Sequence, residues 1–394
     1  MKETERYRYF SVQPKMAFYF VLFITVVGLM APFIANDNPL IAYDNNNHNV
    51  ILPIFNHHIN QEDFTPILKP LIPYGEHNID LRNANAVGPF EQQNIKSSYY
   101  RHWLGTDELG RDVLSQLIYG CKTAIFTALL SMLFAAIIGL SIGGVSAYFG
   151  DNKLRASILR ICCTSLLLLS LLSTIAVVMP WGIKTVGTIK MWLIGLVILV
   201  SFIAISFVLH LVISYIEKSF KLKKYPLAID LFIGRLIEIF ESLPLFFIII
   251  AISALFKPSF LGLVFIISFS SWPRIAKYFR AEVFVVKDLA YIESGHALGF
   301  SNFRILVKHI LPNAISSVLV VLSFGVASAI LIEATLSFLG FGLSADQASW
   351  GKLLAGARID YKAWWLAIFP GLAIFFTVMS FNQLGDKFGR LKKS

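Results

Sequence analysis

Eight long apolar runs constrain this chain more than any other feature of its sequence. Each is about as long as the roughly 20 residues that a helix needs to cross the hydrocarbon core of a bilayer. In lipid, backbone polar groups must be paired within the segment, so we read the runs as helices rather than strands. The runs lie at Met16–Ala35, Ala124–Phe149, Ile158–Pro180, Met191–Tyr215, Ala228–Phe256, Phe260–Phe279, Asn313–Phe341 and Trp364–Leu384. The sequence therefore predicts an all-α polytopic membrane protein with about eight spans.

Composition and charge agree with this class. Hydrophobic residues make up 56% of the chain and charged residues only 15%, whereas soluble domains are about a quarter charged. The net charge of +10 reflects Lys and Arg expected in cytoplasmic loops, and it does not indicate nucleic acid. Basic residues precede the first run and follow the last, so both termini are expected in the cytoplasm. These are Lys2, Arg6, Arg8 and Lys15, then Lys387, Arg390, Lys392 and Lys393.

The polar segment between the first two runs is expected to form a small folded cap outside the membrane. Six prolines between residues 36 and 119 make long regular elements there unfavourable. Its histidines have no spacing that fixes a metal geometry, so no metal site is predicted. They are His48, His57, His58, His77 and His102. The three cysteines lie at or inside apolar runs and predict neither a disulfide framework nor a metal site.

A polar segment, Arg280–Pro312, separates two later runs and favours two short helices with a break. Gly299 can end the first helix, Ser301 or Asn302 can cap the second, and Pro312 can open the next span. The candidate residues for docking a partner are Glu293, Ser294, Gly295, His296, Ala297, Gly299, Leu311 and Pro312. The alternative is an amphipathic loop lying on the bilayer surface.

Two further motifs lie on the expected outer side. In the first, Asp107 is a candidate N-cap for an interfacial helix leading into the second span, and Asp107 with Arg111 would form a structural ion pair. The residues of this motif are Gly105, Thr106, Asp107, Gly110, Arg111 and Asp112. The second motif holds Glu333, Ser337, Gly340, Trp350 and Gly351. Because a carboxylate in an apolar run is costly, Glu333 is read as a paired structural carboxylate, with proton relay as the alternative.

These three motifs, in this order, resemble the permease subunits of bacterial ABC importers. Glu293, Gly299, Leu311 and Pro312 fit the cytoplasmic signature of that family, while Ser294, Gly295 and His309 depart from it. The Leu104–Val113 and Glu333–Gly340 strings are similar to the second permease subunit of the oligopeptide, dipeptide and nickel group. Short matches at Asn36–Leu40 and Ile72–Tyr74 resemble the long-loop branch that includes microcin C permeases.

The resemblance implies a six-span permease core into which this chain inserts a two-span hairpin. It divides the chain into a cytoplasmic N-terminus with the first span (1–35) and a periplasmic loop with an interfacial helix (36–120). The second span and inner turn (121–157) and the inserted hairpin with a basic inner loop (158–224) come next. The remaining core (225–394) would contain the coupling loop 280–312 and the last two spans.

The resemblance also implies partners rather than cofactors. A second permease subunit, two ATP-binding cassette ATPases and a periplasmic or lipid-anchored solute-binding protein would complete an importer in the inner membrane. The chain itself contains no phosphate-binding loop of the Gly-x-x-x-x-Gly-Lys-Ser/Thr type, so ATP hydrolysis is expected in partners. Cargo stays open among oligopeptides, dipeptides, nickel and antibiotic peptides. A secondary transporter or a membrane-embedded enzyme are the rival interpretations.

Overall fold

The computed structural model describes most of the chain and divides it into two compact units. The first unit is Met1–Gly144 with Arg235–Ser394, and the second is Val145–Gly234. Two helices, α4 and α7, run across the boundaries between them. The described residues are 14–44, 50–51, 64–151, 153, 155–157, 159–160, 163–167, 170, 174, 188–220, 222–253, 258–344 and 346–391.

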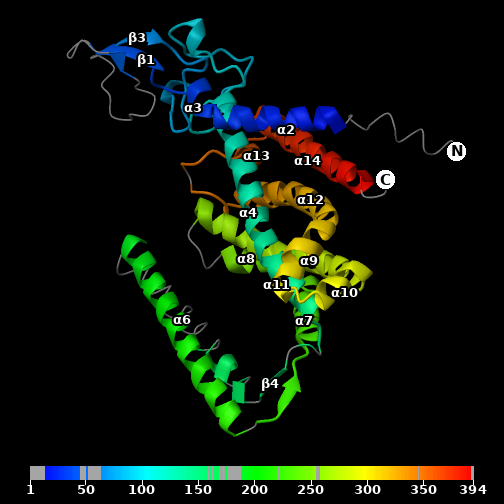
Figure 1. Ribbon diagram of the computed structural model, residues 1–394. Helices are drawn as coiled ribbons and strands as arrows, with labels where there is room; N and C mark the ends of the chain where they lie inside the picture. Colours follow the sequence, from blue (N-terminus) through cyan, green and yellow to red (C-terminus); the bar gives the residue numbers. More distant parts are fainter. Residues whose placement is uncertain are drawn as a thin grey trace, which may run out of the picture. The chain divides into compact units, whose positions relative to one another are not determined.

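Helices form the body of the first unit (Figure 1). They are α2 (Pro14–Leu29), α3 (Ala31–Ile34), α4 (Val113–Phe149), α7 (Ile229–Ser242), α8 (Leu245–Ser253), α9 (Phe260–Lys287), α10 (Ala290–Ala297), α11 (Asn302–Ile305), the π-helical turn η5 (Leu306–Ile310), α12 (Leu311–Phe338), α13 (Trp350–Ile359) and α14 (Trp365–Leu391). Helix α12 packs against α9, α13 and α14, and α14 packs against α2. This arrangement places α12 at the centre of the unit.

The described residues confirm an all-α polytopic class. Five helices are long and apolar enough to cross a membrane, or up to six if the bent pair α7 and α8 counts as one span. The predicted run Met16–Ala35 holds the shorter apolar helix α2. Much of the predicted run Ile158–Pro180 lies outside the described residues, as do Lys2, Arg6 and Arg8. The total of eight crossings therefore stays a prediction.

Several helices do not coincide with the predicted apolar runs. The run Ala228–Phe256 is broken after Ser242, and α7 and α8 meet at a bend of 88°. Pro244 explains the break, because the residue before a proline is driven out of the helical region. The run beginning at Phe260 does not end at Phe279, since α9 continues to Lys287. The backbone hydrogen bonds of a helix are made within the helix. A membrane-spanning helix can therefore continue beyond the hydrocarbon core into water.

The outer loop folds with short elements, as its prolines predict. Three strands, β1 (Ile41–Asp44), β2 (Val50–Ile51) and β3 (Phe64–Leu68), form an antiparallel sheet in the order β2-β1-β3. Single-turn helices η3 (Leu81–Asn83) and η4 (Ser98–Tyr100) follow. The loop is attached to α4, because the Gln116 side chain donates to the Glu76 carbonyl at 2.7 Å. His48, His57 and His58 lie outside the described residues.

The second unit contains the whole of the predicted insertion 158–224. Strands β4 (Arg155–Ser157) and β5 (Lys224–Pro226) pair in antiparallel register, with Ser157 opposite Lys224. Helix α6 (Thr188–Ser219) ends near this pair, where Glu217 accepts from Arg160 at 2.9 Å and from the Ser157 hydroxyl at 2.7 Å. These contacts tie the two ends of the insertion to each other.

Candidate functional site

The segment from α10 to η5 joins α9 to α12 through two short helices, as the sequence predicts. Helix α10 ends at Ala297, and the Phe300 amide donates to the Gly295 carbonyl at 3.0 Å, closing the helix end. The Ser301 hydroxyl then accepts from the Arg304 amide at 3.3 Å and caps α11. Pro312 lies in the first turn of α12. The break between the helices is therefore made by local hydrogen bonds.

Gly299 occupies a backbone conformation that few other residues adopt. Its φ is +78°, and a Cβ built there would meet nothing within 4 Å. The requirement at this position is therefore conformational rather than steric. An L-residue in the left-handed region costs roughly 1–2 kcal/mol, which glycine avoids.

The candidate docking residues lie on both sides of this segment. Gly295 faces inward with the buried Ile292, Ile305 and Ile310. The other docking candidates point to solvent or lie half-buried: Glu293, Ser294, His296, Ala297, Gly299, Leu311 and Pro312. His309 stacks on Phe300 with ring centroids 5.7 Å apart. The inner face thus fixes the segment to the bundle and leaves the outer face available.

Large apolar side chains project from the solvent-facing side of the α10–η5 segment. Leu298 is 73% exposed and Phe303 is 76% exposed, and they flank the turn at Gly299. Arg304 lies beside them, with its guanidinium 4.1 Å from the Phe300 ring centroid. Exposed apolar residues rimmed by charge are typical of a protein interaction site. Sequence reasoning missed Leu298 and Phe303, because it followed the signature residues instead of exposure.

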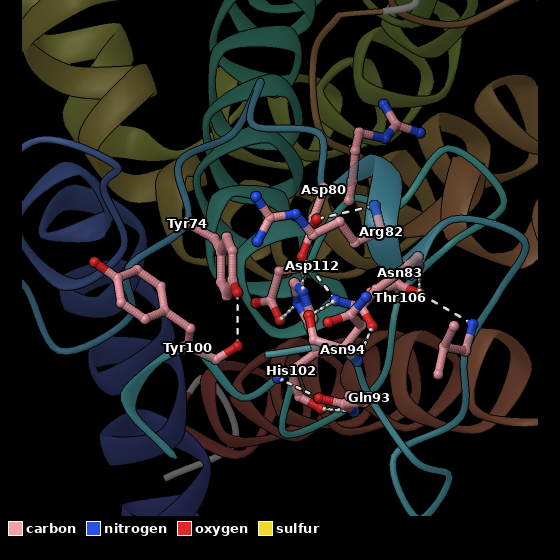
Figure 2. A network of polar contacts seen from close by, with 12 residues as sticks. Tyr74, Asp80, Arg82, Asn83, Gln93, Asn94, Tyr100, His102, Thr106 and Asp112 are labelled. Carbon is pink, nitrogen blue, oxygen red and sulfur yellow. Dashed lines mark hydrogen bonds and ion pairs between the residues drawn. The ribbon is translucent and has the colours of Figure 1, made fainter. Parts of the chain in front are cut away.

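A second polar constellation lies in the outer loop, around the fully buried His102 (Figure 2). Its Nδ1 lies 3.0 Å from Oδ1 of Asp112, its Nε2 lies 3.5 Å from Oδ2 of Asp80, and its ring stacks on Tyr74 at 4.2 Å. Gln93 exchanges two hydrogen bonds with the His102 backbone, at 2.9 and 2.8 Å. The histidine therefore connects the start of α4 to the rest of the loop.

The surroundings of His102 shift the pKa values of two neighbouring groups, Asp80 and Tyr74. Burial tends to raise the pKa of Asp80, but hydrogen bonds from Asn83, the Arg82 amide and His102 outweigh it and leave the pKa below its usual value. The pKa of Tyr74 is raised, first by burial and then by the charges of Asp80 and Asp112. Tyr74 consequently stays a hydrogen-bond donor, and its hydroxyl donates to the Tyr100 carbonyl at 2.6 Å.

The motif from Gly105 to Asp112 differs from its prediction in one respect. Asp107 does not cap an interfacial helix: it closes a turn, accepting from the Leu109 and Arg111 amides at 3.0 and 2.8 Å. The helix α4 begins at Val113 and runs unbroken to Phe149. Asp112 is the capping residue, because its Oδ2 accepts from the Ser115 amide at 2.7 Å. Gly105 and Gly110 have φ of +80° and +84°, which a helix could not accommodate.

The predicted ion pair in this motif is present. The Nε of Arg111 lies 2.7 Å from Oδ2 of Asp107, and both side chains are largely buried. Thr106, also fully buried, donates from its hydroxyl to the Asn83 carbonyl at 2.7 Å and accepts from the Val87 amide at 3.0 Å. These contacts serve to hold the loop together.

Glu333 is fully buried in α12 and is paired through one oxygen. Its Oε1 accepts from the hydroxyls of Ser337 and Ser349, both at 2.8 Å. Its Oε2 has no hydrogen-bond partner among the described residues. Gly351 lies so close to the Ala334 backbone that no Cβ would fit there, and Trp350 donates to the Leu117 carbonyl at 3.0 Å. Glu333 thus ties the start of α13 to α12, and Trp350 ties α13 to α4.

Lys352, which the sequence analysis did not single out, lies half-buried beside this cluster. Its ammonium donates to the carbonyls of Ser344 and Gln347. Burial, followed by the charge of Arg111, lowers its pKa to about 8, against the opposing charges of Asp346, Glu333 and Glu76. Within the described parts of the chain, no group of three or more His, Cys, Asp or Glu side chains could hold a metal ion.

Part of the chain matches a known protein family. Residues 224–391 match the family described as the binding-protein-dependent transport system inner membrane component. This stretch runs from β5 to the end of α14 and contains the α10–η5 segment, α12 and the Glu333 cluster. Over this stretch the chain is similar to the inner membrane components of binding-protein-dependent transport systems.

Individual relatives of this chain are named as permeases of peptide-type transport systems. The chain is 38% identical over 159 residues to a peptide transport system permease protein of Brucella suis, covering 40% of this chain and 53% of the relative. It thus spans about half of that relative's length. It is 26% identical to a dipeptide transport system permease of Bacillus subtilis, covering 75% of this chain and 69% of the relative. A peptidoglycan transport system permease of Agrobacterium fabrum is 24% identical, with 92% and 83% covered. The chain is thus similar to permease proteins of peptide-type transport systems.

Proposed function

We propose that this chain is the permease subunit of an ATP-driven importer that moves peptides across the bacterial inner membrane by alternating access. The observation that carries the proposal is the α10–η5 segment, whose buried face is fixed to the bundle while Leu298 and Phe303 project outward. This segment joins α9 directly to α12, so a push on it would reach both candidate spans. Both termini would lie in the cytoplasm.

The proposed importer requires partner subunits in addition to this chain. A push on α10–η5 requires a motor, and the sequence carries no phosphate-binding loop of its own. Two ATP-binding cassette subunits would supply the ATP hydrolysis, and one of them would dock on the face around Glu293, Gly299 and Phe303. A second permease subunit would complete the pathway, and an external solute-binding protein would deliver cargo. The names of the relatives, which include peptide and dipeptide transport permeases, favour peptides as that cargo.

Site-specific photo-cross-linking from position 303 in native membranes tests this docking. Phe303 should cross-link to a protein that mass spectrometry identifies as carrying an ATP-binding cassette. The matched control is position 81, because Leu81 is 81% exposed on the outer loop and should not reach that protein. Cross-linking of the cassette protein from position 81 but not 303 would reverse the proposed orientation.

A charged substitution gives the functional half of the test. Phe303→Asp should reduce ATP-dependent peptide uptake by about tenfold or more, since losing an aromatic hot spot at an interface costs about 2 kcal/mol or more. Leu81→Asp should leave uptake unchanged. Uptake that survives ATP depletion and collapses with the proton gradient would instead favour a secondary transporter, in which the buried Glu333 carboxylate would be the natural proton carrier.

A further inference from the structure

The outer loop encloses a cavity that the transport proposal does not use. Its volume is about 400 Å³, within the range of small-molecule binding sites. Its wall comes from four stretches of the loop: the residues after α3, the end of β3 with the prolines that follow it, the segment around Tyr74–Arg82, and the segment Asn94–Tyr100. Each stretch belongs to the first unit.

Charge in the cavity wall favours an anionic ligand. Lys69, Arg82 and Lys96 all line it, against the carboxylates of Asp37 and Asp80. Asp80 is already engaged by Asn83, the Arg82 amide and His102. None of the three cations forms an ion pair with another described residue. Their heads are thus able to bind a carboxylate, while Asp37 can accept an ammonium group.

The aromatic part of the wall is held in place before any ligand binds. The Tyr74 hydroxyl donates to the Tyr100 carbonyl at 2.6 Å, and the Tyr99 hydroxyl donates to the Pro70 carbonyl at 2.7 Å. Lys69 lies over the Tyr99 ring at 5.6 Å. Because the hydroxyls are fixed, the rings can present their faces to apolar groups with little further loss of side-chain entropy. Asn78 and Asn94 line the same cavity and add amides that can pair with a peptide backbone.

We propose that this cavity binds a short peptide with a free carboxy terminus, at a site separate from the membrane-spanning helices. The cations bind the carboxylate, the asparagine amides pair with backbone amides, and the tyrosine rings cover apolar side chains. The ligand class follows from the composition of the wall and stands whether or not the chain uses ATP-driven partners.

Titration of the purified full chain in lipid nanodiscs tests the proposal, with trialanine and trialanine amide as probes. The free acid should bind, and the amide should bind at least about tenfold more weakly, because the charge-assisted hydrogen bonds to the carboxylate are lost. Arg82→Gln and Lys96→Gln should each weaken binding of the free acid severalfold. The control Lys362→Gln removes an exposed cation that lies outside the cavity wall and should have no effect.

Three results would overturn the site: no binding of trialanine, equal binding of acid and amide, or displacement by equimolar inorganic phosphate. Equal loss of affinity in Lys362→Gln would show a general charge effect and would also count against it. The Arg82 and Lys96 side chains are exposed, so unchanged thermal melting should show that their variants fold. Phe303→Asp should leave trialanine binding intact, so failure of this site and failure of the ATPase-docking proposal give different results.

Discussion

At the scale of single residues, the structure depends on buried polar groups that find distant partners. His102 is the clearest case, since its ring is fully buried between Asp112 and Asp80, which lie 10 residues after it and 22 residues before it. Burying a carboxylate such as Asp112 is tolerable only when it is paired. His102 thus pairs with two carboxylates, a role that neither its sequence neighbours nor a helix pattern indicates.

His102→Ala should lower the free energy of unfolding by about 3 kcal/mol, because it leaves Oδ1 of the buried Asp112 without its partner and removes the stacking on Tyr74. Chemical denaturation of the purified chain followed by its tryptophan fluorescence would measure this loss. Lys69→Ala is the control, since Lys69 is exposed and forms no hydrogen bond to another described residue. Equal stability of His102→Ala and Lys69→Ala would contradict the network.

Lys352 gives a prediction about pH. Its pKa falls from 10.5 to about 8 on folding, chiefly through burial. The unfolded chain therefore binds more protons than the folded chain between pH 8 and 10.5, so the Lys352 contribution to stability becomes more favourable as pH rises through that window. The melting temperature of the wild type minus that of Lys352→Met should increase from pH 7.5 to 10.5. If the difference between the two melting temperatures stays constant over this pH range, the lowered pKa of Lys352 is excluded.

At the scale of elements, the turn between α10 and α11 decides how the proposed docking face is presented. Gly299→Val should uncouple ATP hydrolysis from uptake, because a β-branched residue at φ +78° forces the turn to rearrange. Gly299→Asn is the matched control, since asparagine tolerates the left-handed region and should keep most of the uptake. Both variants should insert normally, as a Cβ there touches nothing. Normal coupled uptake by Gly299→Val would argue against a coupling role for the turn.

At the scale of the whole molecule, the second unit has the form of a removable insertion. Ser157 and Lys224 face each other in the β4–β5 pair, so a two-residue Asn-Gly turn could replace residues 158–223. An even number of crossings would be lost, which keeps every later segment on its original side. The shortened chain should still insert, with an unchanged location for a reporter fused to its C-terminus. Reversal of that reporter would show that the insertion contains an odd number of crossings.

The sequence predicted features formed by residues close together in the chain better than features formed by distant residues. The turn at Gly299 and the cap at Ser301 were predictable because they involve residues only a few positions apart. Asp107 was misassigned for the opposite reason: its residue type suits a helix cap and a turn equally well. The cavity in the outer loop, the exposed Phe303 and the lowered pKa of Lys352 had no local pattern that could have indicated them.

The sequence by itself determined that apolar helices cross a membrane and that a polar elbow separates α9 from α12, since length, hydropathy and backbone pairing act within each segment. Only the tertiary structure decided that Glu333 binds Ser349 and that His102 connects two carboxylates. It also decided that α4 begins at Val113. A buried polar group takes whichever partner the packing brings to it, and packing joins residues that are far apart in the chain.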